Sequence, residues 1–170
     1  MTSIFIIGIG IVMWVLFGYS LSFAPSGNAF IGDFRWLGLE GVSLTEGYTD
    51  DASIPNMVFS AFQMMFAVIT PALITGAVAG RMKFKSIFVF TIFWSLIVYY
   101  PLAHMVWGQG GLLGADGIGA LDFAGGDVVH ISSGVSALVL CILLGKRHDY
   151  EHSIYRIHNI PTVVLGASLL

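Results

Sequence analysis

Four long stretches of this chain contain no Asp, Glu, Lys or Arg, and this feature restricts the fold more than any other. They are residues 4–23, 54–80, 86–106 and 128–144. A helix needs about 20 mostly apolar residues to cross a bilayer, a length that the fourth stretch reaches only if its helix begins near Asp122. Unpaired backbone groups are not tolerated in lipid, which disfavours open β-sheet. The sequence therefore predicts an all-α, polytopic transmembrane helix bundle, a single incomplete domain over 1–170 with spans at about 4–23, 54–80, 86–106 and 122–144 and a truncated span from 160.

The composition agrees with a protein surrounded by hydrocarbon. Hydrophobic residues make up 56% of the 170 residues and charged residues only 10%, whereas soluble domains carry about a quarter charged residues. Seven Lys and Arg residues, widely spread, form no basic stripe, so a nucleic-acid partner is not expected. Cys141, the single cysteine, cannot form an internal disulfide.

The charged residues between the apolar stretches predict the orientation. Residues 24–53 and 107–127 contain one basic residue against eight acidic ones, and residues 81–85 and 146–159 contain the other six basic residues. Cytoplasmic loops carry an excess of Lys and Arg. Residues 81–85 and 146–159 are therefore predicted to be cytoplasmic, and the two acidic loops to lie outside.

A cleaved signal peptide is the competing interpretation of the first stretch. No basic residue precedes it, it is long for a signal core, and residues 21–24 make a poor cleavage site. We therefore interpret it as a retained span of a multi-pass cell-membrane protein. The absence of a targeting segment favours a bacterial or archaeal plasma membrane.

Ionisable residues at the start of the fourth span are the main candidates for function. His130 is expected about two turns, or about 12 Å, past Asp122 if this segment is helical from Asp122 onward. A histidine at that depth usually faces a cavity or a partner, and its neutral ring can hydrogen-bond a small polar solute. The alternative is a histidine satisfied by a neighbouring helix. Asp122 is also a preferred helix cap, and capping is compatible with a pore role.

Aromatic residues near the predicted outer surface have two interpretations each. Trp107 fits an interfacial aromatic belt, or it forms a cation–π platform for a small cation. Phe62 and Phe66 are spaced i, i+4, which is typical of packing residues as well as of a gate. His104, three residues before Trp107, is most simply an interfacial side chain.

These residues belong to segments that resemble the ammonium transporter (Amt/Mep/Rh) family. The segment 122–147, DFAGGDVVHISSGVSALVLCILLGKR, is similar to that family's signature from end to end. The preceding helices of the family resemble residues 14–23 (WVLFGYSLSF), 61–84 (AFQMMFAVITPALITGAVAGRMKF) and 101–113 (PLAHMVWGQGGLL). The resemblance covers nearly the whole chain and is weakest in the outer loops.

The resemblance implies a role for each candidate residue. Trp107 and Phe62 match aromatic residues that line an outer ammonium recruitment site, and Phe66 matches the outer phenylalanine of the pore gate. Asp122 matches the aspartate beneath that site, which supports its geometry and the binding of the ion. His130 matches the first of two histidines that line a hydrophobic pore. The implied function is transport of ammonium or ammonia, with no cofactor.

The family pattern also extends beyond this chain. Family members have eleven helices, assemble as homotrimers and commonly bind a PII-type nitrogen-signalling protein on the cytoplasmic face, where residues 146–159 are predicted to lie. This chain matches the second helix to the start of the sixth, without the second pore histidine, the inner gate phenylalanine or the serine that completes the recruitment site. We therefore interpret it as an N-terminal-half piece of a transporter.

Two other functions compete with transport. An intramembrane metalloenzyme using His104 and His130 would need a ligand spacing such as HExxH, which this sequence does not contain. A non-conducting truncated membrane fragment or an assembly partner fits the same ancestry as a transporter.

Overall fold

The computed structural model describes residues 2–25, 28–115, 117–147, 150–151 and 159–169. These residues form helices and loops and contain no β-strand, apart from one isolated bridge between Gly47 and Pro55. Parts of the predicted cytoplasmic segment 146–159 lie outside the described residues. The prediction of an all-α bundle is confirmed.

Four helices of the described part are long and apolar enough to cross a membrane. They are Thr2–Phe23, Asn56–Val78, Phe84–Trp107 and Gly126–Leu144. Each contains at most two charged residues in its most apolar window, because a helix that faces hydrocarbon cannot place charges there. A shorter apolar helix, α7, runs over Ile160–Leu169 and is exposed along its length.

Short π-helical segments lie within the first and third of these helices and form the start of the fourth, and they divide these helices into labelled parts. The parts are α1 (Thr2–Met13), η1 (Trp14–Gly18) and α2 (Tyr19–Phe23); α3 (Asn56–Val78), which is uninterrupted; α4 (Phe84–Trp94), η3 (Ser95–Tyr99) and α5 (Tyr100–Trp107); and η4 (Gly126–Ile131) and α6 (Ser132–Leu144). A π-helical turn shifts the face that the following residues present, and such turns are frequent at functional sites.

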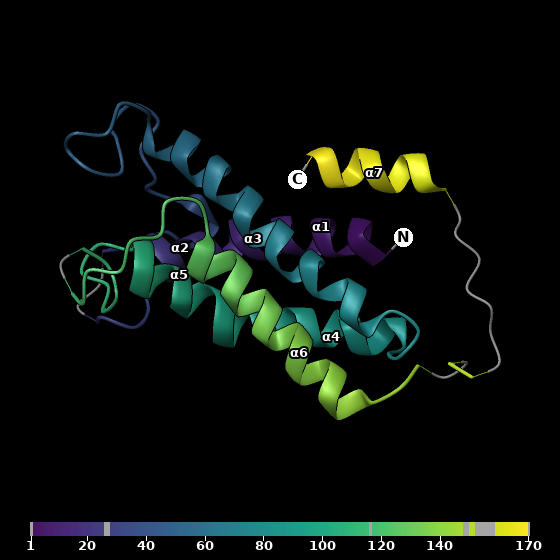
Figure 1. Ribbon diagram of the computed structural model, residues 1–170. Coiled ribbons are helices and arrows are strands. Elements are labelled where there is room, and N and C mark those ends of the chain that lie inside the picture. The colour runs from purple at the N-terminus through teal and green to yellow at the C-terminus, as the bar shows by residue number, and fades with distance from the viewer. Residues whose placement is uncertain (1, 26–27, 116, 148–149, 152–158, 170) are drawn as a thin grey trace.

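The long helices pack side by side as an up-and-down bundle (Figure 1). Helix α3 packs against both α1 and α6, and α2 packs against α5. The long loops 24–55 and 108–125 lie at one end of the bundle, and the short segments 79–83 and 145–147 lie at the other (Figure 1). The loops that were predicted to share one side of the membrane therefore lie at the same end of the bundle.

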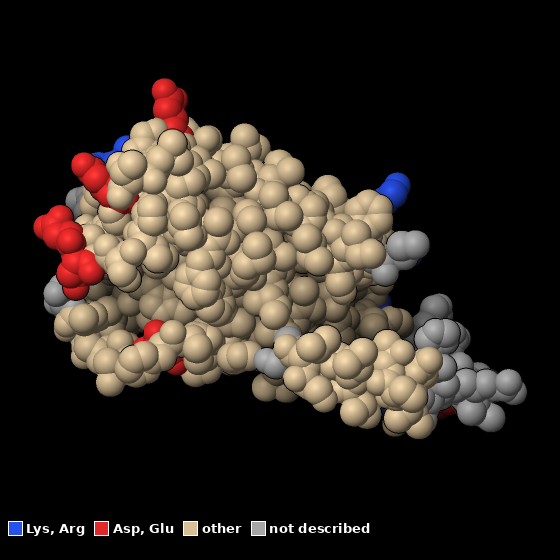
Figure 2. Space-filling model, turned by 90° about the horizontal axis from the view of Figure 1, so that it is seen from above, with Lys and Arg blue, Asp and Glu red and all other residues tan. Residues whose placement is uncertain are grey.

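Contacts between loops fix each end. At the end with the long loops, the Gln109 side-chain amide donates to the Tyr48 carbonyl oxygen at 2.9 Å. At the opposite end, Arg81 Nε donates to the Gly145 carbonyl oxygen at 2.9 Å. Acidic side chains gather at the end with the long loops (Figure 2). This charge separation agrees with the orientation predicted from the sequence.

Large aromatic side chains form the core near the long-loop end. Trp14, Tyr19, Tyr99 and Tyr100 are each at most 1% exposed. Small residues let the helices approach: a Cβ atom on Gly18 would lie 2.8 Å from Cζ of Tyr100. The bundle is therefore closely packed where the end of η1 meets α5.

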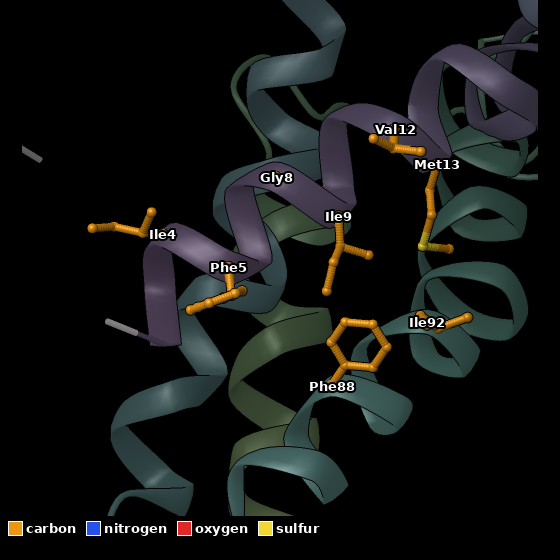
Figure 3. A pocket seen from close by; sticks show the side chains of 8 residues that line it. All are labelled: Ile4, Phe5, Gly8, Ile9, Val12, Met13, Phe88 and Ile92. Carbon is orange, nitrogen blue, oxygen red and sulfur yellow. The ribbon is translucent and has the colours of Figure 1, made fainter.

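A groove of about 500 Å³ lies between α1 and α4, away from these loops. Its lining is apolar throughout (Figure 3) and consists of Ile4, Phe5, Gly8, Ile9, Val12, Met13, Phe88 and Ile92. The side chains that line the groove include no acidic or polar group that could replace the hydration of a cation. We therefore place the candidate site elsewhere.

Candidate functional site

Three aromatic side chains form a continuous line at the long-loop end of the bundle. Phe62 and Phe66 project from successive turns of α3, and their ring centroids are 5.1 Å apart with the rings perpendicular. Trp107, the last residue of α5, continues the line at 5.6 Å from Phe66. Phe62 is 54% exposed, whereas Phe66 and Trp107 are half-buried. The line therefore runs from an open face of the bundle towards its interior.

A backbone contact fixes the orientation of the Trp107 indole. Its Nε1 donates a hydrogen bond to the carbonyl oxygen of Asp122 at 3.0 Å. This bond joins the end of α5 to the segment that enters the fourth long helix. A belt tryptophan needs no such partner within the protein, whereas a fixed indole face suits a cation–π platform.

The Asp122 carboxylate caps the fourth long helix with both oxygens. Its Oδ1 accepts from the backbone N–H groups of Gly125 and Gly126, at 2.6 and 2.8 Å. Its Oδ2 accepts from Asp127 and Val128, at 2.8 and 3.0 Å. Capping was predicted from the residue type; the use of four donors was not.

The predicted start of this helix near Asp122 is wrong. The helix begins at Gly126, because Gly125 adopts a left-handed conformation with φ +88° that ends the preceding turn. Asp122 consequently lies in a loop that folds back over the helix N-terminus. The separation of two helical turns between Asp122 and His130 therefore does not apply.

The electrostatics of Asp122 follow from these contacts. Burial raises the pKa of the carboxyl group, but the four backbone N–H groups outweigh burial and hold the pKa below its ordinary value. The group is therefore ionised near neutral pH. It provides a fixed negative charge whose oxygens are already occupied, so it acts on a nearby cation through its field.

His130 faces away from the helix contacts. It lies in the π-helical segment η4, and its backbone N–H donates to the Gly125 carbonyl oxygen at 2.9 Å. Val128 and Val129 are buried in the bundle, whereas the His130 side chain is exposed and has no hydrogen-bond partner among the described residues. The described residues therefore do not support the alternative in which a neighbouring helix hydrogen-bonds the His130 side chain.

His104 does not occupy the interfacial position that was expected from the sequence. Its side chain is 0% exposed and contacts the backbone of the segment 22–28. The sequence did not indicate these contacts, because the partners of His104 lie far from it along the chain. The only local signal was a histidine within an apolar helix, one turn before Trp107.

The structure thus brings together four of the five predicted site residues through successive contacts: Phe62, Phe66, Trp107 and Asp122. His130 lies further along the helix that Asp122 caps. No group of three or more His, Cys, Asp or Glu side chains suited to a metal ion occurs in the ranges that the structure describes.

Comparison with known proteins identifies the family to which this arrangement belongs. The model of the Ammonium Transporter Family matches residues 1–170. The chain belongs to the ammonium transporter family. It is 52% identical over 159 residues to an ammonium transporter of Bacillus subtilis, covering 94% of this chain and 38% of that relative. It is 45% identical over 161 residues to ammonium transporter 1 of Dictyostelium discoideum, covering 94% of this chain and 34% of that protein.

Solved structures of the family share the fold of this chain. The crystal structure of Candida albicans Mep2 matches with a TM-score of 0.81 and 34% identity, covering 98% of this chain and 37% of that one. Saccharomyces cerevisiae Mep2 matches with a TM-score of 0.81 and 36% identity, covering 99% of this chain and 38% of that one. The family resemblance expected from the sequence is confirmed, and the chain spans less than half the length of these relatives.

Proposed function

We propose that this chain supplies the outer recruitment site and part of the pore of a transporter for ammonium or ammonia. The observation that carries the proposal is the aromatic line of Phe62, Phe66 and Trp107 ending beside the ionised Asp122. The relatives from Bacillus subtilis and Dictyostelium discoideum are ammonium transporters by name, which supports the substrate. The protein that contains this chain is then a multi-pass membrane transporter rather than an enzyme.

The chemistry of the site matches the demands of a small cation. Ammonium loses hydration when it leaves water for an apolar pore, and an ion inside a membrane is expensive. The indole face of Trp107 and the rings of Phe62 and Phe66 offset part of that loss by cation–π attraction. The field of Asp122 adds to the attraction without a direct bond to the ion.

The exposure of the His130 side chain in this chain supports a role in the pore. A histidine at membrane depth without a partner costs free energy unless another part of the protein or a solute meets it. We infer that the remainder of the transporter faces His130, Phe62 and the open side of α6, and closes the pore there. His130 then hydrogen-bonds the deprotonated solute along the pore.

Assembly and regulation are further parts of this proposal. The family resemblance favours a homotrimer of complete subunits and binding of a PII-type protein at the cytoplasmic end, near 79–83 and 145–147. The plasma membrane is the expected location, and the bacterial or archaeal assignment rests on the sequence alone.

A non-conducting membrane fragment or an assembly partner is the second candidate. The exposure of His130 and Phe62 favours it for the chain by itself, because the described residues leave these side chains on an open face. The two candidates differ in whether the chain acts within a longer transporter.

Uptake of radiolabelled methylammonium by cells that express the intact transporter tests the proposal. Trp107→Leu removes the platform, and Trp94→Leu, a matched substitution of a tryptophan remote from the aromatic line, is the control. We expect Trp107→Leu to raise KM strongly and the control to leave KM unchanged at equal surface expression. Equal KM values for both variants would contradict the recruitment role.

A further inference from the structure

The groove between α1 and α4 is about as long as one leaflet of a bilayer is deep. Its lining on α1 begins at Ile4 and ends at Met13, nine residues further on, which is about 14 Å at a rise of about 1.5 Å per residue. The hydrocarbon core of a bilayer is about 30 Å thick, so each leaflet contributes about 15 Å. The groove therefore extends over the depth that one lipid acyl chain occupies.

The side chains around the groove leave it open to hydrocarbon. Gly8 contributes no side chain, and a Cβ atom at this position would meet no atom of another segment within 4 Å. Ile9 of α1 points towards Phe88 of α4 across the space (Figure 3). Ile4 and Val12, which also line the groove, are 67% and 57% exposed. A flexible chain of CH₂ groups can fill such a space without leaving a polar group unpaired.

The groove lies in the half of the bundle that faces the cytoplasm in the predicted orientation. Helix α4 begins at Phe84, directly after the short segment 79–83, and α1 begins at Thr2. The rings of Phe5 and Phe84 have their centroids 5.0 Å apart, so the first turns of the two helices lie side by side. The groove thus runs from the cytoplasmic interface into the membrane.

Two lysines stand at the cytoplasmic mouth of the groove. Lys83 directly precedes α4, and Lys85 lies in its first turn. Lys85 precedes Phe88 by three residues and Ile92 by seven, which places it on the face of α4 that lines the groove. Both lysines are exposed, and neither forms an ion pair with a residue that the structure describes. Helices α1 and α4 contain no Asp or Glu, so the groove-forming helices do not neutralise this charge.

The combination of an apolar groove and a basic mouth identifies the occupant. A lysine can lay its apolar stem along hydrocarbon and hold its ammonium group at the interface. The cytoplasmic leaflet carries anionic lipids, which attract basic residues at its surface. A zwitterionic headgroup would bring its own ammonium group close to the lysines. Another apolar protein segment would fill the groove but would give the lysines no anionic partner.

We propose that the groove binds one acyl chain of an anionic phospholipid from the cytoplasmic leaflet, and that Lys83 and Lys85 hold the phosphate of its headgroup. The site is separate from Trp107 and Asp122 and does not depend on the proposed transport function. The bound lipid joins α1 to α4 and stabilises the folded protein, because it binds only where the two helices are assembled.

Photo-cross-linking in vesicles tests the proposal on the intact transporter. Two lipid probes carry a diazirine in the same acyl chain and differ only in the headgroup, which is phosphatidic acid or phosphatidylcholine. Labelled peptides are identified by mass spectrometry. We expect the phosphatidic acid probe to label residues 4–13 and 88–92 in preference to the phosphatidylcholine probe. Because the preference is electrostatic and lies at the interface, it should decrease as the salt concentration rises.

Substitutions separate the acyl chain from the headgroup. Gly8→Leu fills the groove and should remove labelling of it by both probes. Ile7→Phe is the matched control, because Ile7 is 43% exposed on the same helix but does not line the groove, and it should leave the labelling unchanged.

The lysine variants should affect only the choice of headgroup. Lys83→Gln and Lys85→Gln should each lower the preference for phosphatidic acid about fivefold, and labelling by the phosphatidylcholine probe should stay the same. Lys83→Arg and Lys85→Arg keep the charge and should keep the preference. All the substituted positions except Gly8 are exposed, and the Gly8 position has free space, so the variants should fold; thermal unfolding checks this.

Three results would overturn the proposal. Equal labelling of the wild-type groove by both probes would show contact with hydrocarbon but no recognition of the headgroup. No labelling by either probe would show that another part of the transporter fills the groove. A preference for phosphatidic acid that survives both Lys→Gln substitutions would exclude the two lysines as its cause. None of these results depends on uptake, so failure of the proposed transport function would be recognised separately.

Discussion

Replacing Asp122 by Asn tests the link between the helix cap and the proposed cation site. The Asn amide keeps one oxygen for two backbone N–H groups, but its NH₂ group faces the other two donors, which in the structure are those of Asp127 and Val128. These N–H groups then lack an acceptor, at about 1 kcal/mol each or more. The lost attraction between the charge and the helix N-terminus adds about 0.3–1 kcal/mol.

We therefore expect Asp122→Asn to lower the free energy of unfolding by about 2–3 kcal/mol in total. Asp127→Asn is the matched control, because Asp127 lies in the first turn of the same helix and its side chain accepts no hydrogen bond from the described residues. That control removes only the attraction to the helix terminus, about 0.3–1 kcal/mol. The assay is thermal unfolding of the purified intact transporter, followed by intrinsic fluorescence at fixed detergent concentration.

The pH dependence gives a second, independent reading. The folded-state pKa of Asp122 is held below the unfolded value of about 3.9, so its stabilisation is present above that value and is lost as pH falls through the folded-state pKa. The wild-type protein should lose this contribution on acidification, and Asp122→Asn should not. Equal destabilisation by Asp122→Asn and Asp127→Asn, with equal acid sensitivity, would refute the reasoning.

Three further substitutions test the site and the packing beneath it. Trp107→Phe keeps an aromatic ring but loses the 3.0 Å bond to the Asp122 carbonyl oxygen, so the KM for methylammonium should rise about threefold to tenfold, measured by radiolabelled uptake. His130→Ala should abolish or reshape uptake without loss of folding, because its side chain is exposed in this chain; uptake with unchanged rate and selectivity would remove His130 from the mechanism. Gly18→Ala would place a Cβ atom 2.8 Å from the Tyr100 ring and should destabilise the protein by about 1–3 kcal/mol, checked by thermal unfolding. An unchanged midpoint would show that η1 and α5 separate easily.

The local features of the proposed cation site were predictable to different extents. The cap at Asp122 follows from residue type. The first backbone N–H groups of a helix lack acceptors within the helix, and an aspartate carboxylate just before the helix can accept from them. The first turn of that helix was misplaced, because the positive φ of Gly125 depends on how the loop folds back. His104 was misjudged because its partners, Ser22 and Asn28, are adjacent to it only in the folded bundle.

The sequence by itself determined the helical class and the two ends of the bundle. Long uncharged stretches favour helices because hydrocarbon offers no partners for charges or free backbone groups, and the distribution of Lys and Arg then assigns the loops to sides. The tertiary structure alone decided that Phe66 on α3 meets Trp107 on α5, and that α5 ends against a buried imidazole. Spacing along one helix sets which residues share a face, whereas contacts between helices depend on packing that no single segment contains.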